Sequence, residues 1–324
     1  MRKTSRILVA GHRGLVGSAL VRRLACERYE QVVVGSREEF DASDAESARV
    51  FFERERPEYV FLAAACVGGI KASFRRPAEF MQPNLAIAAA TLRAACEAGV
   101  ERLLFFACSC IYPASAPQPI AETSLLTGPF EGTSELYALA KLAGVKLCEA
   151  YNRQHGTRFL SVCPPTLYGV NDNFDVESAH VISALIRRFD AAVAARRPER
   201  VAVWGSGCPR REFLYADDLA SACLFLMDLD DLTYTSLVER PASLLNVGPG
   251  DEIPIRDLAL LIASIVGFEG EVAFDASMPD GAGRKLLDCT AMQRLGWKPE
   301  TPLDEGLRRT YEWYRAEAPS RIAR

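Results

Sequence analysis

The pair Tyr137 and Lys141 is the feature of this 324-residue chain with the clearest chemical meaning. The two residues lie four apart in Ser134-Glu-Leu-Tyr-Ala-Leu-Ala-Lys141, so a helix places them on one face. A cation beside a phenol favours the phenolate, and we expect it to lower the pKa of Tyr137. Such a tyrosine can exchange a proton with a carbonyl or hydroxyl oxygen. The same spacing also occurs on ordinary solvated helices, so the interpretation depends on the rest of the chain.

A glycine-rich turn near the start of the chain supports a catalytic interpretation. The apolar run 6–10 precedes Gly11-His-Arg-Gly-Leu-Val-Gly17, and an amphipathic run, 18–27, follows it. Strand, glycine turn and helix are the context of a dinucleotide-binding fingerprint, in which the backbone approaches a diphosphate at the positive end of the helix. An ordinary glycine-rich turn is the alternative. The cofactor contacts expected from this turn are Gly11, Arg13, Gly14, Leu15, Val16 and Gly17.

The end of the second predicted strand, 31–35, indicates which dinucleotide is bound. An acid there would accept the ribose hydroxyls of NAD, but the residues are Gly35-Ser-Arg37, and Arg13 lies inside the glycine turn. Two guanidinium groups without a carboxylate favour the 2′-phosphate of NADP(H). Two unrelated surface arginines would give the same sequence.

Short apolar runs alternate with helical patterns through residues 1–165. This alternation predicts an α/β fold, a Rossmann-type doubly wound parallel sheet that binds the dinucleotide. Proline and glycine interrupt the rhythm later, and we predict a smaller, mixed carboxy-terminal substrate lobe over 166–324, with segments that return to the sheet. The predicted strands are 6–10, 31–35, 59–63, 102–106, 158–163 and 200–204. The predicted helices are 14–28, 44–55, 77–99, 134–155, 178–195, 217–227, 251–266 and 303–316.

Composition excludes several classes of partner. A net charge of −4 gives no electrostatic reason to expect nucleic acid or an anionic membrane, and no apolar run is long enough to span a bilayer. The ten cysteines include no CxxC pair, and with three histidines they predict reduced thiols rather than disulfides or a metal site. The opening residues lack the apolar stretch of a secretory signal, so we expect a cytoplasmic protein.

Many separated segments together resemble the extended short-chain dehydrogenases that act on nucleotide sugars, and most closely the GDP-L-fucose synthase family. The resemblance covers residues 5–315, essentially the whole chain. Besides the glycine turn and the Tyr–Lys pair, it rests on Ala63-Ala-Ala65, Val67-Gly-Gly-Ile70, Ser109-Cys-Ile-Tyr-Pro113, 146–153, Asp172-Asn-Phe174, His180-Val-Ile182, 203–207, 211–218, Pro279-Asp-Gly281 and 284–288.

The resemblance implies an NADPH-dependent reaction of GDP-4-keto-6-deoxy-D-mannose, with epimerisation at C3 and C5 and reduction at C4. Cys110 and His180 match the acid/base pair of the epimerisation, and thiols and imidazoles both exchange protons near neutral pH. Tyr137 matches the residue that protonates the C4 oxygen. Lys141 matches the residue that holds the cofactor ribose and lowers the pKa of the tyrosine.

The resemblance also implies residues that bind the cofactor and the substrate. Taken alone, the residues of the site are also compatible with purely structural roles. Cys110 alone is compatible with a small buried apolar residue, and His180 with a polar helix residue. Further cofactor contacts are implied for Ala63, Ala64, Ala65, Ala107, Pro164, Thr166, Leu167 and His180. Substrate contacts are implied for Arg188, Trp204, Arg211 and Asp280.

Cys108 departs from the family pattern, because the family has a serine there that hydrogen-bonds the substrate O4. A thiol is the weaker donor, so we expect stabilisation of the C4 oxyanion to fall by about 1 kcal/mol if that hydrogen bond is lost. The alternatives are an enzyme that mainly epimerises, or one that acts on a related GDP-linked sugar of the colitose or 6-deoxyheptose type. A non-catalytic NADP(H)-sensing protein on the same fold is a further alternative.

Folds of this kind often pair through helices, and we expect a homodimer through 77–99 and 134–155.

Overall fold

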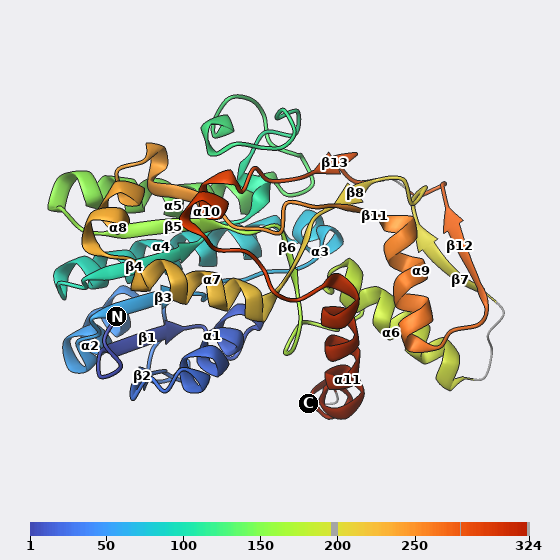
Figure 1. Cartoon of the computed structure of the whole chain (residues 1–324), viewed down its shortest axis with the longest axis horizontal. Helices are drawn as coiled ribbons and strands as arrows, with labels where there is room; N and C mark the ends of the chain where they lie inside the picture. Colours follow the sequence, from blue (N-terminus) through green and yellow to red (C-terminus); the bar gives the residue numbers. More distant parts are fainter. Residues whose placement is uncertain (196–199, 279, 323–324) are drawn as a thin grey trace.

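The apolar runs of the first half form one parallel sheet in the computed structural model, which describes residues 1–195, 200–278 and 280–322. The strand order is β10-β5-β4-β3-β1-β2, and every neighbouring pair is parallel. This confirms the predicted doubly wound α/β fold (Figure 1). The strands are β1 (Arg6–Ala10), β2 (Gln31–Val33), β3 (Tyr59–Leu62), β4 (Arg102–Phe106), β5 (Phe159–Cys163) and β10 (Leu244–Asn246).

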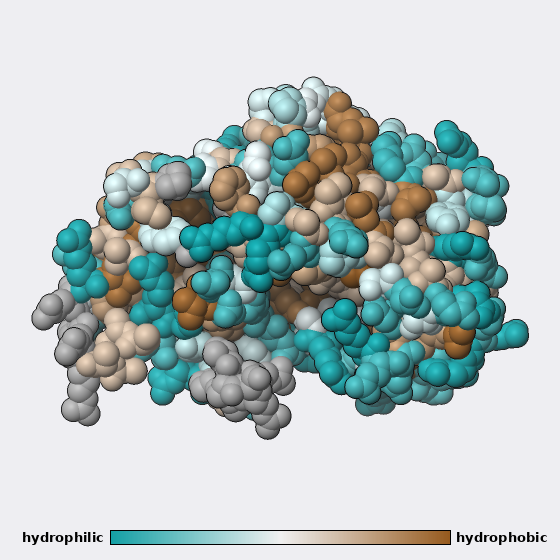
Figure 2. Space-filling model, turned by 180° about the vertical axis from the view of Figure 1, so that it is seen from behind, coloured by the Kyte–Doolittle hydropathy of each residue, from teal (hydrophilic) through white to brown (hydrophobic). Residues whose placement is uncertain are grey.

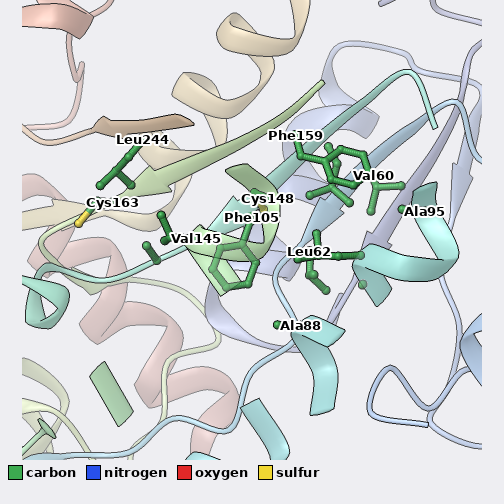
Figure 3. Close-up of a cluster of buried hydrophobic side chains, with 14 of the residues drawn as sticks. Val60, Leu62, Ala88, Ala95, Phe105, Val145, Cys148, Phe159, Cys163 and Leu244 are labelled. Atoms are coloured by element: carbon green, nitrogen blue, oxygen red, sulfur yellow. The ribbon is translucent and has the colours of Figure 1, made fainter. Parts of the chain in front are cut away.

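Both faces of the sheet are buried, because successive residues of a strand point to opposite sides. On β1, Leu8 and Ala10 join one core, while Ile7 and Val9 join the other. Figure 3 shows part of the first core, where Leu62 and Phe105 of the sheet meet Ala88 and Val145 of the covering helices. That face is covered by α2 (Ala45–Glu55), α4 (Pro77–Glu97) and α5 (Glu135–His155). The opposite face is covered by α1 (Leu15–Cys26), α7 (Ala216–Asp228), α8 (Asp231–Val238) and α10 (Thr290–Leu295).

A smaller lobe lies beside the sheet and has its own apolar core (Figure 1). Its mixed character is confirmed, since β8 pairs antiparallel with β11 and parallel with β13. Its helices are α6 (Val181–Ala194), α9 (Ile255–Val266) and α11 (Leu303–Ile322). Its strands are β6 (Thr166–Tyr168), β7 (Arg200–Trp204), β8 (Arg210–Arg211), β9 (Phe213–Tyr215), β11 (Ile253–Pro254), β12 (Glu271–Asp275) and β13 (Arg284–Lys285).

Several later segments pack on the large sheet rather than on the small lobe. β10 forms its edge, and α7, α8 and α10 contribute to its second core. The division near residue 165 stays a prediction about the organisation of the chain. Within the described residues, no helix has both the length and the apolar character needed to cross a membrane.

Candidate functional site

The turn after β1 forms a backbone cradle against the loop that follows β3. Gly11 has a φ of +85°, and a Cβ there would lie 2.6 Å from the backbone nitrogen of Ala64. A Cβ on Gly17 would collide with the carbonyl group of Gly11. The helix α1 begins with Gly14 as its N-cap, with no side-chain cap and no acid in its first turn. Its first N–H groups therefore have no side-chain partner, and the cradle fits the diphosphate of a dinucleotide.

The position of the cradle agrees with that fit. β1 lies between β2 and β3, so the chain changes direction across the sheet at this point. Ligands of open α/β sheets bind at such topological switch points. The predicted contacts Ala63, Ala64 and Ala65 follow β3 directly, beside Gly11.

Two exposed arginines and two acids lie near the end of β2 and in the glycine turn. Arg13 and Arg37 are both exposed, and the Arg37 Nε lies 3.7 Å from Oδ2 of Asp41. The carboxylate of Glu39 accepts a hydrogen bond from the Ser36 N–H at 2.9 Å. This bond and the Ser36 hydroxyl hold the pKa of Glu39 below its ordinary value. An acid therefore lies close to the end of β2, slightly later in the chain than the position considered from sequence.

Tyr137 and Lys141 lie one turn apart in α5, beside the carboxyl end of β4. The Lys141 side chain is buried, and its Nζ donates a hydrogen bond of 2.9 Å to the carbonyl oxygen of Phe106, the last residue of β4. The chain then passes through Cys108 into a short 3₁₀ turn, η1 (Ser109–Ile111). The phenol of Tyr137 is hydrogen-bonded to the Cys108 thiol, and Cys110 lies close to both groups.

The pKa of Tyr137 is raised well above its ordinary value, mainly by burial and then by the negative charges that Cys108 and Cys110 can carry. The net direction is therefore opposite to the lower pKa that we expected from the Lys141 charge. Burial also lowers the pKa of Lys141 itself, since desolvation disfavours the ammonium. The phenol consequently carries its proton at neutral pH.

The pKa values of Cys108 and Cys110 are shifted in opposite directions. Burial raises the pKa of Cys108, but hydrogen bonds from the thiol and backbone N–H of Cys110, with the charges of Lys141 and Lys285, bring it below its ordinary value. The hydrogen bond to Cys108 and burial raise the pKa of Cys110 well above its ordinary value. The sulfur of Cys108 is thus the acceptor in this pair.

His180 lies in a second group, at the start of α6. It is the N-cap residue of that helix, and its carbonyl oxygen accepts from the Ala184 N–H at 2.8 Å. Its imidazole lies near the carboxyl group of Asp172, which also accepts a hydrogen bond from the Ser183 hydroxyl. Burial raises the pKa of Asp172, while Ser183 and the charge of His180 oppose that shift. Sequence reasoning included Asp172 in a family segment but gave it no role.

The four predicted substrate residues gather around the end of β7. Arg188 of α6 donates a hydrogen bond to the carbonyl oxygen of Ala202, and Trp204 ends the strand with about half of its surface exposed. The Asp280 carboxylate accepts from the N–H and the hydroxyl of Ser206, at 2.9 and 2.7 Å. A guanidinium nitrogen of Arg211 would lie 3.0 Å from a Cβ on the neighbouring Gly281.

An ion pair that sequence reasoning missed lies between the thiols and the substrate residues. The Nζ of Lys285 is 3.8 Å from Oε2 of Glu131. The charge of Lys285 acts on Cys108 and Cys110, and the charge of Glu131 acts on Arg211. Burial lowers the pKa of Arg211, while Glu131 and Asp280 oppose that effect. The two partners are 154 positions apart in sequence (285 minus 131), so no local spacing indicates the pair.

The remaining predicted cofactor residues lie at the same edge of the sheet. The N–H of Ala107, just after β4, donates to the carbonyl oxygen of Val162 at 2.9 Å. Pro164, Thr166 and Leu167 follow β5, the latter two in β6. Pro279, in the segment that also contains Asp280, lies outside the described residues. The part of the chain that the structure describes contains no group of three His, Cys, Asp or Glu side chains placed to hold a metal.

The chain is similar to known proteins along most of its length. Residues 7–235 match the model of the NAD dependent epimerase/dehydratase family. The probable GDP-L-fucose synthase 1 of Oryza sativa subsp. japonica is 50% identical over 313 residues, which cover 96% of this chain and 92% of that protein. The GDP-L-fucose synthase of Escherichia coli (strain K12) is 48% identical over 309 residues, 95% of this chain and 96% of that protein.

A solved structure is similar along almost the entire chain. It is a GDP-mannoheptose C4 reductase from Campylobacter jejuni with NADP bound. The TM-score is 0.87 at 34% sequence identity, and the match covers 97% of this chain and 99% of the reductase. The similarity extends over both the large sheet and the small lobe.

Proposed function

This chain belongs to the NAD dependent epimerase/dehydratase family and, within it, to the GDP-L-fucose synthases, and we propose that it converts GDP-4-keto-6-deoxy-D-mannose into GDP-L-fucose. The reaction combines epimerisation at C3 and C5 with NADPH-dependent reduction at C4. The observation that carries the proposal is the cluster of Tyr137, Lys141 and Cys110 at the carboxyl end of β4. Such a cluster supplies proton donors at the sheet edge where dinucleotides bind.

We infer that the cofactor is NADP(H). The cradle of Gly11 to Gly17 and the start of α1 would hold the diphosphate, and Arg13 and Arg37 would bind the 2′-phosphate. Lys141 has further N–H donors for the ribose hydroxyls beyond the one directed at Phe106. When bound, NADPH supplies the hydride for C4. Equal kcat/KM values with NADH and NADPH would contradict this cofactor preference.

Reduction needs a proton for the C4 oxygen, and Tyr137 is placed to supply it. Its raised pKa keeps the phenol protonated before the reaction. The buried ammonium of Lys141, one helical turn away, then stabilises the phenolate that remains. A protonated phenol beside a buried cation suits proton donation to a ketone oxygen.

Epimerisation needs a base on one face of the sugar and an acid on the other, because the C4 ketone makes the C3 and C5 protons acidic. Cys110 and His180 supply this pair. Cys110 is held by the η1 turn, and His180 by the N-terminus of α6 beside Asp172. The two residues come from different lobes, so a sugar between the lobes would meet both.

The small lobe offers groups suited to a nucleoside diphosphate. Arg188 and Arg211 are the candidate ligands of the diphosphate, since guanidinium groups form charge-assisted bonds to phosphate. Trp204 exposes a ring for stacking, and Asp280 can accept hydrogen bonds from the base or sugar. The GDP moiety would therefore lie along the end of β7.

The test is an incubation in D₂O with NADPH and GDP-4-keto-6-deoxy-D-mannose, followed by NADPH absorbance and proton NMR. We expect NADPH loss with deuterium at C3 and C5. Tyr137→Phe should lower turnover by roughly 100- to 10,000-fold, the usual contribution of a general acid, while NADPH binding persists. Unchanged turnover in this variant would refute the role of Tyr137.

A related GDP-linked keto-sugar is the second candidate substrate. Cys108 at the usual serine position and the similarity to a GDP-mannoheptose C4 reductase favour it. Deuterium exchange without NADPH loss would identify a protein that mainly epimerises. NADPH binding without either reaction would direct the assay first to colitose- and 6-deoxyheptose-type sugars and then to a sensing role.

We also propose a cytoplasmic homodimer that pairs through the outer faces of α4 and α5. Figure 2 shows apolar residues gathered on the face opposite to the view of Figure 1, where these two helices lie. Leu136 of α5 is among the exposed apolar side chains. A monomer mass by light scattering at micromolar concentration would contradict the dimer.

A further inference from the structure

The thiols of Cys108 and Cys110 lie against each other. The proposed reaction uses the thiol of Cys110, but it does not require a cysteine at position 108. The Cys108 sulfur accepts hydrogen bonds from the N–H and thiol of Cys110 and from the phenol of Tyr137. Both cysteines are partly exposed. Two neighbouring thiols in a partly exposed turn have chemistry of their own.

The two thiols differ in reactivity, and this difference predicts which of them reacts first with an oxidant. Lys141 and Lys285 provide positive charge near Cys108, and its pKa lies below the ordinary value despite burial. The thiolate is the nucleophilic form of cysteine, so Cys108 is the thiol that attacks first. Cys110 keeps its proton longer and lies against it.

Neighbouring cysteines are less suited to the same chemistry. Cys163 is fully buried at the end of β5, and burial raises its pKa well above the ordinary value. Burial also raises the pKa of Cys66, which follows β3. An oxidant that reaches the site would therefore react with Cys108 before either of them.

The backbone allows a bond between the two sulfurs. Cys108 is extended, but Ser109 begins the η1 turn, so the two Cα atoms lie closer than the roughly 7 Å that two fully extended residues span. Disulfides join Cα atoms about 4.4 to 6.8 Å apart. The hydrogen bond from the Cys110 thiol to the Cys108 sulfur already directs the two side chains toward each other.

We propose that Cys108 and Cys110 are an oxidation site, at which a hydroperoxide converts the two thiols into a disulfide. The Cys108 thiolate attacks the peroxide O–O bond and becomes a sulfenic acid, and the leaving oxygen departs as water or alcohol after taking a proton. The Cys110 sulfur then displaces the hydroxyl of that sulfenic acid as water. Two electrons pass from the thiols to the peroxide, and a dithiol reductant reverses the change.

The disulfide removes groups that the proposed reaction uses. Cys110 loses the proton that it exchanges with the sugar, and Tyr137 loses the sulfur acceptor that holds its phenol. We expect turnover to fall by roughly 100-fold or more, the contribution of one general acid or base. Dithiothreitol should restore it.

The experiment treats the full chain with hydrogen peroxide, blocks free thiols with N-ethylmaleimide, and digests with trypsin. Both cysteines lie in the single tryptic peptide Leu103–Lys141, because no lysine or arginine lies between its ends. We expect this peptide to lose two hydrogen atoms, to take up no N-ethylmaleimide and to regain both thiols after reduction. The mass readout does not depend on the proposed substrate, so it separates failure of this proposal from failure of the proposed function.

Variants assign the order of events and guard against misfolding. Cys110→Ser should accumulate a sulfenic acid at Cys108 that dimedone traps, whereas Cys108→Ser, which lacks the attacking thiol, should form no disulfide in this peptide. Cys26→Ser, which removes an exposed thiol at the end of α1, should oxidise like the original chain. NADPH binding reports whether each variant is folded. A peptide that stays in the dithiol form, or a link from Cys108 to Cys66 or Cys163, would overturn the proposal.

Discussion

At the scale of single residues, Cys108 is the position that we expect to influence the reduction at C4 most. Its sulfur accepts hydrogen bonds from Cys110 and from Tyr137, and its pKa lies below the ordinary value because donors and two lysine charges outweigh burial. A sulfur in this arrangement is a weaker hydrogen-bond donor to an oxyanion than a hydroxyl group would be. We therefore expect Cys108 to support reduction less well than the serine of the family.

Cys108→Ser should shift the balance between the two steps of the reaction. A hydroxyl donates to the C4 oxygen, so we expect the rate of NADPH oxidation to rise about fivefold, equivalent to one hydrogen bond of about 1 kcal/mol. Deuterium exchange at C3 and C5 should change less, because it depends on Cys110 and His180. The ratio of the two rates, measured in one D₂O assay, checks this. Cys26→Ser, which changes an exposed thiol at the end of α1, serves as the control.

An unchanged ratio in Cys108→Ser would mean that the residue at this position does not contact the C4 oxygen. A rise in both rates by the same factor would instead indicate a general improvement in folding or substrate binding. Only a selective gain in reduction supports the hydrogen-bond argument.

Sequence reasoning could identify the reactive side chains but not their electrostatics. The spacing of Tyr137 and Lys141 correctly predicts that they share a helix, since the i, i+4 relation is local. The direction of the Tyr137 pKa was wrong because burial and the thiols of a distant loop outweigh the helical neighbour. Burial is a tertiary property, and spacing along one helix carries no information about it.

At the scale of elements, α5 positions the proposed catalytic pair because it packs closely against β4. Gly144 makes this approach possible, since a Cβ there would lie 2.8 Å from Cε1 of Phe105 and closer still to its Cζ. The same strand ends at Phe106, whose carbonyl oxygen accepts from Lys141. The distance between helix and strand therefore fixes where the ammonium and the phenol lie.

Gly144→Ala should move α5 away from the sheet. Alanine favours a helix over glycine by up to about 1 kcal/mol, but overpacking against Phe105 costs about 1 to 3 kcal/mol. We expect a net loss in the free energy of unfolding, measured by urea denaturation, and a lower kcat because Lys141 and Tyr137 shift. Urea denaturation and kcat report the two consequences separately.

Phe105→Leu supplies the matched control for this prediction. The shorter side chain lacks the ring atoms that a Cβ at position 144 would meet, so Gly144→Ala should cost less in that background. We expect a coupling energy of about 0.5 to 3 kcal/mol in the double-mutant cycle, the range for residues in contact. Additive effects of the two substitutions would show that the ring does not limit the approach of the helix.

The length and periodicity of a helix or strand determine whether it can be predicted from the sequence. The central strands 6–10 and 102–106 match the structure because both faces of a parallel sheet demand continuous apolar runs. The two-residue strands β8, β11 and β13 have no readable period, and their pairing is set by the loops between them. The helix predicted from residue 251 begins at Ile255, because Pro254 lacks an N–H and belongs to β11.

At the scale of the whole molecule, the buried carboxyl group of Glu212 joins three distant segments. It lies between β8 and β9 of the small lobe and is 1% exposed. Its two oxygens accept from the N–H groups of Gly250, after β10, and Leu287, before α10, each at 2.9 Å. Glu212 follows Arg211 directly, so this contact also holds strand β8, which carries this proposed substrate ligand.

The environment of Glu212 couples folding to pH. Burial raises its pKa to about 7, the backbone donors oppose this, and the charges of Asp251 and Glu252 add to it. Cys289 also lies against this carboxyl group. In the unfolded chain the carboxyl ionises near its ordinary value of about 4.3. Between these values the folded state holds a proton that the unfolded state has lost, so stability falls as pH rises and levels off above about 7.

Glu212→Gln should flatten this dependence. A shift from about 4.3 to about 7 corresponds to roughly 3 to 4 kcal/mol of stability lost between pH 4 and 8. Glutamine does not ionise, so urea denaturation at a series of pH values should give the variant a smaller decrease over that range. The variant starts lower at pH 5, because its amide group leaves one of the two buried N–H donors without an acceptor.

Glu312→Gln, on the exposed side of α11, should keep the slope of the original chain. Equal slopes for Glu212→Gln and the original chain would mean that this carboxyl group ionises as freely in the folded protein as in the unfolded one, and the contact between the segments would then be independent of pH.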